Sequence, residues 1–105
     1  MIISLVYVFK KGIEILLPGG VPVRAVSEGK VVYSGKLPNY GQVVIIDHGD
    51  HYYSLCAHLG ASSKKVNELV KAGDQIGQSG NPGTPLYFEI RARNIAVNPL
   101  QWLFN

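Results

Sequence analysis

The sequence predicts a small all-β domain with at most one or two short helical turns. Runs rich in Val, Ile, Tyr and Phe alternate with clusters of Gly, Pro and Asn, which is typical of short strands joined by turns. Of the 105 residues, 47% are hydrophobic and 16% are charged, a balance that supports a packed core and excludes an intrinsically disordered chain. This length suits one core, so a single domain over residues 1–105 is expected.

The expected strands follow one another along the chain, with a loop over 36–41 and a hairpin turn at 48–50. Residues 42–47 contain four consecutive β-branched residues, as in a strand buried on both faces. Only residues 62–71 show helical spacing, with Val66, Leu69 and Val70 at i, i+3 and i+4. The strands are predicted over residues 1–9, 13–17, 21–26, 30–34, 42–47, 51–58 and 86–91.

Charge and composition exclude several classes of function. Ten basic and seven acidic residues give a net charge of +3, and the basic residues form no block of the kind that binds nucleic acid. No apolar run approaches the roughly 20 residues that a membrane-spanning helix needs. Cys56 is the only cysteine, so no disulfide forms within the chain. The first nine residues lack the preceding positive charge and the small-residue cleavage site of a signal peptide.

One cluster, Asp47, His48, Asp50, His51 and His58, contains residue types that bind zinc. His48 and His51 flank a tight turn, however, and polar residues are favoured in turns whatever the function. We therefore expect these two side chains to point into water, and we assign the cluster no metal. His58 ends an apolar strand, where both a half-buried structural histidine and a functional one are compatible with the sequence.

Four blocks of sequence resemble the LytM or lysostaphin-type zinc endopeptidase domain over residues 10–103. In order, they are KKGIEILLPGGVPVRAVSEGKVVYSG, NYGQVVIIDHGDHYYSLCAHL, VKAGDQIGQSG and LYFEIRARNIAVNPLQWL. The resemblance implies antiparallel sheets in a β-sandwich similar to a barrel-sandwich hybrid. In active members, a His-x-Gly-x-Asp motif and the second histidine of a His-x-His before Phe-Glu bind zinc. The first histidine of that pair and another in a Tyr-Ala-His-Leu block assist catalysis.

The matching positions of this chain carry different side chains. Lys10 and Glu14 occupy the first motif, Pro85 and Tyr87 occupy the His-x-His pair, and only His58 retains its histidine. Deprotonating a lysine at neutral pH so that it could bind zinc costs about 4–5 kcal/mol, and proline offers no side-chain base. The resemblance with these replacements implies a non-catalytic domain without metal or cofactor.

Zinc-free LytM domains occur among murein hydrolase activators of the EnvC and NlpD type, and Tyr-Phe-Glu-Ile-Arg is similar to the EnvC kind. This resemblance implies a periplasmic or cell-envelope protein that activates an N-acetylmuramoyl-L-alanine amidase in cell division and daughter-cell separation. A division membrane complex, bound through regions outside this chain, is a further implied partner. An amphipathic helix of the amidase would lie in the vestigial groove. The predicted groove residues are Lys11, Tyr40, Val43, His58, Tyr87, Glu89 and Arg91.

Strand periodicity places Tyr87, Glu89 and Arg91 on one face, and Leu86, Phe88 and Ile90 in the core. The first face is either this binding surface or an ordinary solvated strand face with Glu89–Arg91 charge pairing. Two other functions stay open. One is a peptidoglycan endopeptidase with an altered metal site at Glu14 and His58, and the other is a scaffold domain that pairs with an active paralogue. A lipoyl-type carrier is disfavoured, because no lysine lies at an obvious hairpin tip between apolar neighbours.

Overall fold

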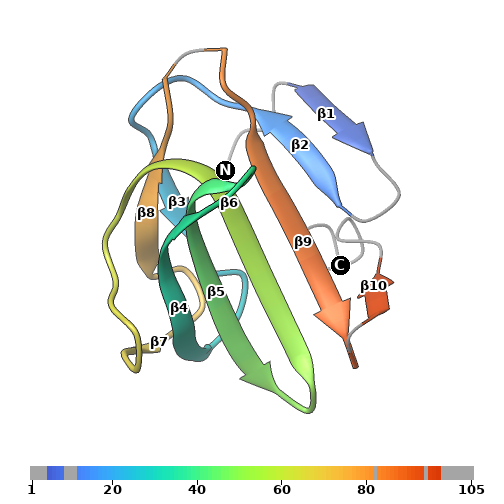
Figure 1. Ribbon diagram of the computed structural model, residues 1–105. Helices are drawn as coiled ribbons and strands as arrows, with labels where there is room; N and C mark the ends of the chain where they lie inside the picture. Colours follow the sequence, from blue (N-terminus) through green and yellow to red (C-terminus); the bar gives the residue numbers. More distant parts are fainter. Residues whose placement is uncertain (1–4, 9–11, 82, 94, 98–105) are drawn as a thin grey trace.

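The computed structural model describes residues 5–8, 12–81, 83–93 and 95–97, and all of their strand pairs are antiparallel (Figure 1). These ranges contain no helix, and therefore none that could span a membrane. The all-β prediction is confirmed. The strands are β1 (Leu5–Val8), β2 (Ile13–Leu16), β3 (Pro22–Arg24), β4 (Gly29–Leu37), β5 (Gly41–Gly49), β6 (Tyr52–Ser62), β7 (Leu69–Val70), β8 (Gln75–Ser79), β9 (Leu86–Ala92) and β10 (Ile95–Val97).

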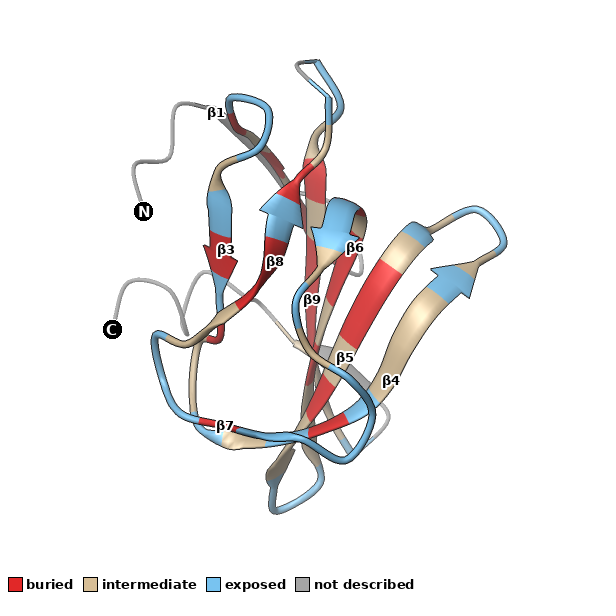
Figure 2. Cartoon of the chain, turned by 90° about the vertical axis from the view of Figure 1, so that its left-hand side faces the viewer, coloured by how far each residue is buried: buried red, intermediate tan, exposed pale blue. Residues whose placement is uncertain are grey.

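The main sheet has the strand order β1-β2-β9-β6-β5-β4-β7, and β10 pairs with β9. The longest strand, β6, links this sheet to a smaller ribbon. Its first half, residues 52–57, pairs with β9, whereas its last residues, 59–62, pair with β8, which in turn pairs with β3. Figure 2 shows β3 and β8 standing apart from β4 and β5, with buried segments on the strands between them. The two parts therefore form a sandwich that shares one bent strand.

The core lies between these parts and follows the alternation that the sequence predicts. Leu86, Phe88 and Ile90 of β9 are buried, and the core also takes in residues 13, 15, 23, 31, 44, 46, 56 and 76. On β5, Val43, Val44 and Ile46 are buried, in line with a strand that is covered on both faces. Burial of Cys56 raises the pKa of its thiol to about 12. The cysteine therefore behaves as a small apolar residue.

The hairpin between β5 and β6 is displaced toward the C-terminus from the predicted turn at 48–50. β5 continues through Gly49, and the turn consists of Asp50 and His51, with φ of 52° and 64°. Two consecutive left-handed residues are typical of a type I′ turn, whose twist matches that of the flanking strands. The predicted hairpin is thus confirmed, with its centre moved.

The helical spacing over 62–71 does not produce a helix. The backbone there bonds to β4 instead: the Asn67 amide donates to the Val31 carbonyl (2.8 Å), and the Val31 amide donates to the Glu68 carbonyl (2.9 Å). Val70 is buried, whereas Leu69 is 77% exposed. The three apolar residues therefore do not share one buried face, and tertiary pairing outweighs a weak local helical pattern.

Candidate functional site

The candidate site lies on the face of β9 that points away from the core. Glu14 of β2 and Tyr87 of β9 are direct cross-strand neighbours, and both side chains are half-buried. Pro85, also half-buried, comes immediately before β9. Lys10 and Lys11 lie outside the described residues. Of the four predicted vestigial metal positions, the structure thus brings Glu14 and Tyr87 side by side. Pro85 lies two residues before Tyr87 in the chain.

Tyr87 is held as a hydrogen-bond donor. Its hydroxyl donates to Glu89 Oε2 at 2.6 Å. Burial, and then the hydrogen bond to Glu89, raise the pKa of Tyr87 well above its usual range. Since a tyrosine must lose this proton to bind zinc tightly, Tyr87 is a poor metal ligand in this setting.

The donor set of the described residues does not fit zinc. Glu14 offers a carboxylate, Pro85 offers no side-chain donor, and Tyr87 is already engaged by Glu89. Within the described ranges, no group of three or more His, Cys, Asp or Glu side chains is placed to hold a metal ion. A structural or catalytic zinc site needs at least three protein ligands of such types.

Glu89 is the buried centre of this face. It has no exposed surface, and its second oxygen, Oε1, accepts a hydrogen bond from Arg91 Nε at 2.7 Å. That hydrogen bond raises the pKa of Arg91 above its usual value. Arg91 itself stays partly exposed, with 39% of its side-chain surface open to solvent. The Glu89–Arg91 charge pairing that either reading of this face expects is therefore present, and its carboxylate is buried.

Two predicted groove residues need correction as direct contacts. Val43 and Glu89 both have 0% of their surface exposed, so neither can touch a partner that docks on this conformation. The sequence predicts Val43 in the groove because it opens the neighbouring strand, but the residue is fully buried. Strand alternation predicts the face on which Glu89 lies, but it does not predict how deeply the side chain is buried.

Gly12 makes room for the network. A Cβ atom on this buried residue would lie 2.9 Å from Glu89 Cγ, 2.8 Å from the Tyr87 hydroxyl and 2.6 Å from the Phe88 carbonyl oxygen. Real Cβ atoms do not approach other atoms so closely, because protein interiors are already close-packed. The glycine in the first motif therefore has a steric role that the sequence analysis did not assign.

His58 and Tyr40 complete the rim beside Tyr87. The β5–β6 register pairs Gln42 with Leu59 and Val44 with Cys56, so both Ala57 and His58 lie opposite the one residue between them. This bulge gives His58 a φ of 59°, and its amide donates to the Tyr40 carbonyl at 2.8 Å. The Tyr40 ring lies 6.0 Å from the Tyr87 ring, at an interplanar angle of 45°. Bulges redirect side chains and are frequent beside functional sites.

A cavity of about 320 Å³ opens beside Arg91 on the same face. Sequence reasoning missed three of its lining residues, because the block that contains them gives them no catalytic or metal-binding role. The signal that identifies them is the register: Ile45 pairs with Leu55, Leu55 pairs with Glu89, and Tyr53 pairs with Arg91. The cavity is lined by Tyr40, Ile45, Tyr53, Leu55 and Arg91.

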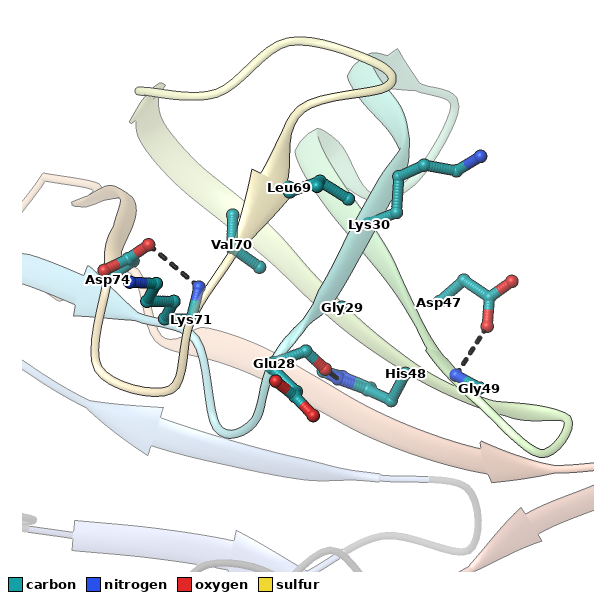
Figure 3. Close-up of a pocket in the computed structure, with 10 residues that line it drawn as sticks. All are labelled: Glu28, Gly29, Lys30, Asp47, His48, Gly49, Leu69, Val70, Lys71 and Asp74. Carbon is teal, nitrogen blue, oxygen red and sulfur yellow. Dashed lines mark hydrogen bonds between the residues drawn. The ribbon is translucent and has the colours of Figure 1, made fainter.

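A larger cavity, of about 600 Å³, lies where the 28–30 segment, the end of β5 and β7 meet (Figure 3). His48 lines it and is not free in water, contrary to the prediction: Nδ1 lies 2.8 Å from the Glu28 carbonyl oxygen, and Nε2 lies 2.7 Å from Ser54 Oγ. Because a carbonyl only accepts, Nδ1 carries a proton. His51 is exposed, as predicted. The cavity is lined by Glu28, Gly29, Lys30, Asp47, His48, Gly49, Leu69, Val70, Lys71 and Asp74.

These features define an all-β domain built like a lysostaphin-type peptidase. Its described residues bring together no set of side chains that could hold a metal ion. The model of Peptidase family M23 matches residues 8–99, and the chain belongs to this family. It is 41% identical over 97 residues to "Murein hydrolase activator NlpD" of Escherichia coli K12, covering 89% of this chain and 26% of that protein. It is 40% identical over 97 residues to "Murein hydrolase activator EnvC" of the same strain, covering 89% and 23%.

Among solved structures, the catalytic domain of lysostaphin from Staphylococcus simulans superposes with a TM-score of 0.79 and 27% identity, covering 92% of this chain and 80% of that chain. The resemblance that the sequence predicts is thereby confirmed. The two activators are equally similar to this chain, within one percentage point of identity. The chain spans about a quarter of their length.

Proposed function

We propose that this domain is a non-catalytic activator of a periplasmic N-acetylmuramoyl-L-alanine amidase, acting in cell division and daughter-cell separation. The observation that carries the proposal is the engagement of Tyr87 by buried Glu89 at a position where an active family member has a zinc-binding histidine. The relatives named as murein hydrolase activators support the same direction.

The groove beside Tyr87 is the proposed docking surface. It combines a half-buried aromatic pair, Tyr40 and Tyr87, with the partly exposed guanidinium of Arg91 and a cavity of about 320 Å³. Tyrosine and arginine are enriched among residues that dominate binding energy. An amphipathic helix of the amidase would place an apolar side chain in the cavity and lie along the groove.

Activation follows from differential affinity. A helix that blocks the amidase's own active site in one conformation and is free to dock in another would be captured by the groove only in the second. Binding then shifts the amidase toward its open state by the difference in affinity for the two conformations. The domain supplies binding energy and performs no chemistry. A division complex would recruit the parent protein through regions outside this chain.

Purified amidases acting on dye-labelled sacculi test this function. We expect dye release by amidase plus domain to exceed release by amidase alone, and the domain alone to release none. Tyr87→Ala and Arg91→Ala should each weaken stimulation by roughly thirtyfold in the concentration required, as for hot-spot residues worth about 2 kcal/mol. Lys36→Ala, which removes one positive charge from an exposed position on β4, is the matched control.

Two outcomes would replace the proposal. Zinc-dependent dye release by the domain alone would establish an endopeptidase with an altered metal site. A stable complex with an active LytM paralogue, together with no stimulation of any amidase, would establish a scaffold.

A further inference from the structure

Glu89 occupies an unusual position for a carboxylate on a proposed docking face. It is fully buried, yet both oxygens are bonded to side chains that reach the surface: Oε2 to the Tyr87 hydroxyl at 2.6 Å and Oε1 to Arg91 Nε at 2.7 Å. A buried charge is costly unless it is paired and hydrogen-bonded. Here the pairing uses one tyrosine and one arginine, both on the same strand.

The geometry of the Arg91 bond leaves part of the guanidinium available. Glu89 engages Nε, and within the described residues the Arg91 side chain makes no other hydrogen bond or ion pair. The two terminal nitrogens, Nη1 and Nη2, therefore remain for a ligand, and together they match the spacing of a carboxylate. A side chain fixed at Nε loses less conformational freedom when it binds than a free arginine does.

Apolar surface lies directly beside this guanidinium. Besides Arg91, the cavity of about 320 Å³ is lined by Tyr40, Ile45, Tyr53 and Leu55. Tyr53 is the cross-strand neighbour of Arg91, and Leu55 is that of Glu89. A ligand whose apolar part fills the cavity would thus place a neighbouring polar group next to the arginine.

We propose that Glu89 is a positioning residue that presets Arg91 at the edge of this cavity, and that the two together recognise an apolar side chain adjacent to a carboxylate. The identity of the partner as an amidase segment rests on the function proposed above; the ligand chemistry does not. The segment would carry Asp or Glu close to a Leu, Ile, Met or Phe. Gly12 secures the arrangement, because any Cβ there would meet both Glu89 and Tyr87.

Two small probes test the ligand chemistry without any partner protein. Phenylpropionate carries one aromatic ring and one carboxylate, and phenylpropanol is its neutral counterpart. In NMR titrations at constant ionic strength, we expect phenylpropionate to shift the Arg91 Nε signal and the signals of the cavity residues. We expect it to bind at least roughly threefold more tightly than the alcohol, as for a partly exposed ion pair.

Variants separate positioning from charge. Glu89→Gln keeps the shape but replaces a charged acceptor with a neutral amide oxygen, so the bond to Arg91 Nε–H is weaker. The Nε–H signal should exchange faster with solvent, and the preference for phenylpropionate should fall. Arg91→Lys keeps the charge but loses the Nε bond and the paired nitrogens, so it should lose the preference as well. Lys36→Ala, an exposed charge on β4, should change neither. If Glu89→Gln does not fold, Arg91→Lys and the wild-type exchange rate still decide the matter.

Each result bears on a different statement. Rapid exchange of the wild-type Arg91 Nε–H, or an equal affinity for acid and alcohol, would overturn the inference even if an amidase is stimulated. A clear preference for phenylpropionate, with no amidase stimulated, would support the carboxylate site and reject the amidase function. If stimulation survives Glu89→Gln and Arg91→Lys undiminished, the amidase does not use this site.

Discussion

Glu14 and Tyr87 face each other across the β2–β9 ladder, the place where the family resemblance puts two zinc ligands. Their side chains differ in their bonding: the Tyr87 hydroxyl donates to Glu89, whereas Glu14 takes no part in the hydrogen bonds that join Tyr87, Glu89 and Arg91. The site therefore keeps the backbone frame of a metallopeptidase but uses the β9 side chains to bond with one another.

Zinc should not stabilise the domain. A ligand that binds only the folded state raises stability by RT ln(1 + [L]/Kd), and the described donors do not form a zinc site. Thermal unfolding in excess zinc chloride should match unfolding in a chelator. A rise in the melting temperature that depends on zinc concentration and disappears in Glu14→Ala would show that a metal site exists.

Replacing Gly12 by alanine should destabilise the domain by about 1–3 kcal/mol, the usual cost of forcing atoms into a packed core. The new Cβ would lie 2.6 Å from the Phe88 carbonyl oxygen. Urea unfolding measures the change. Gly35→Ala is the matched control on β4, because the nearest atom to its added Cβ, the Tyr33 hydroxyl, lies 3.4 Å away. Equal stability losses in the two variants would contradict the steric role of Gly12.

Stability should fall as the pH rises through the alkaline range. Cys56 has a pKa of about 12 when folded, raised from 9.0. The contribution of this group is therefore complete below pH 9 and is lost progressively between about pH 9 and pH 12, because only the unfolded chain releases the proton there. At about pH 10.5 the loss should reach about 2 kcal/mol. Denaturant unfolding across this range, with Cys56→Ala as the comparison, measures the slope that belongs to the thiol.

The same burial predicts that thiol reagents modify Cys56 only after unfolding. At pH 8 the native thiol is protonated and covered, and the thiolate is the reactive form. The rate of labelling should rise with urea along the unfolding curve. Rapid labelling of the native protein in the absence of denaturant would show that β6 opens locally.

Replacing His51 by glycine should stabilise the hairpin by about 0.5–1 kcal/mol. Glycine avoids the energetic cost of a left-handed conformation at this position, and this gain exceeds the extra backbone entropy that glycine gives the unfolded chain. His51 has a φ of 64°, is exposed and lies at the second turn position, where glycine is preferred. Urea unfolding should show a higher midpoint with an unchanged slope. A lower midpoint would mean that the imidazole makes a favourable contact in the turn.

Much of the fold could be predicted because the informative patterns are local. The alternation of Leu86, Phe88 and Ile90 fixes which face of β9 is buried, and the turn residues near Gly49 predict the hairpin. The helical spacing over 62–71 misleads because the backbone of residues 67–70 pairs with β4, more than thirty residues away. A three-residue coincidence at helical spacing carries no information about such a partner.

The candidate site was predictable in position but not in depth. Strand alternation places Tyr87 and Arg91 on one face, yet it also predicts Glu89 as a contact, although the residue is buried. Ile45, Tyr53 and Leu55 could be found only from the strand register, because the family motifs give them no catalytic or metal-binding role. Burial on a sheet face depends on what packs over it, and that is a property of the assembled strands.

Strand β6 joins the two parts of the fold: residues 52–57 pair with β9, residues 59–62 pair with β8, and β5 lies along its other edge for residues 54–56. The amide protons near the centre of that strand, from residue 54 to 57, should consequently exchange with solvent only when the entire molecule opens. A ligand that binds to the outer side of β9 and stabilises it should also slow the exchange of amide protons in the distant β3–β8 ribbon.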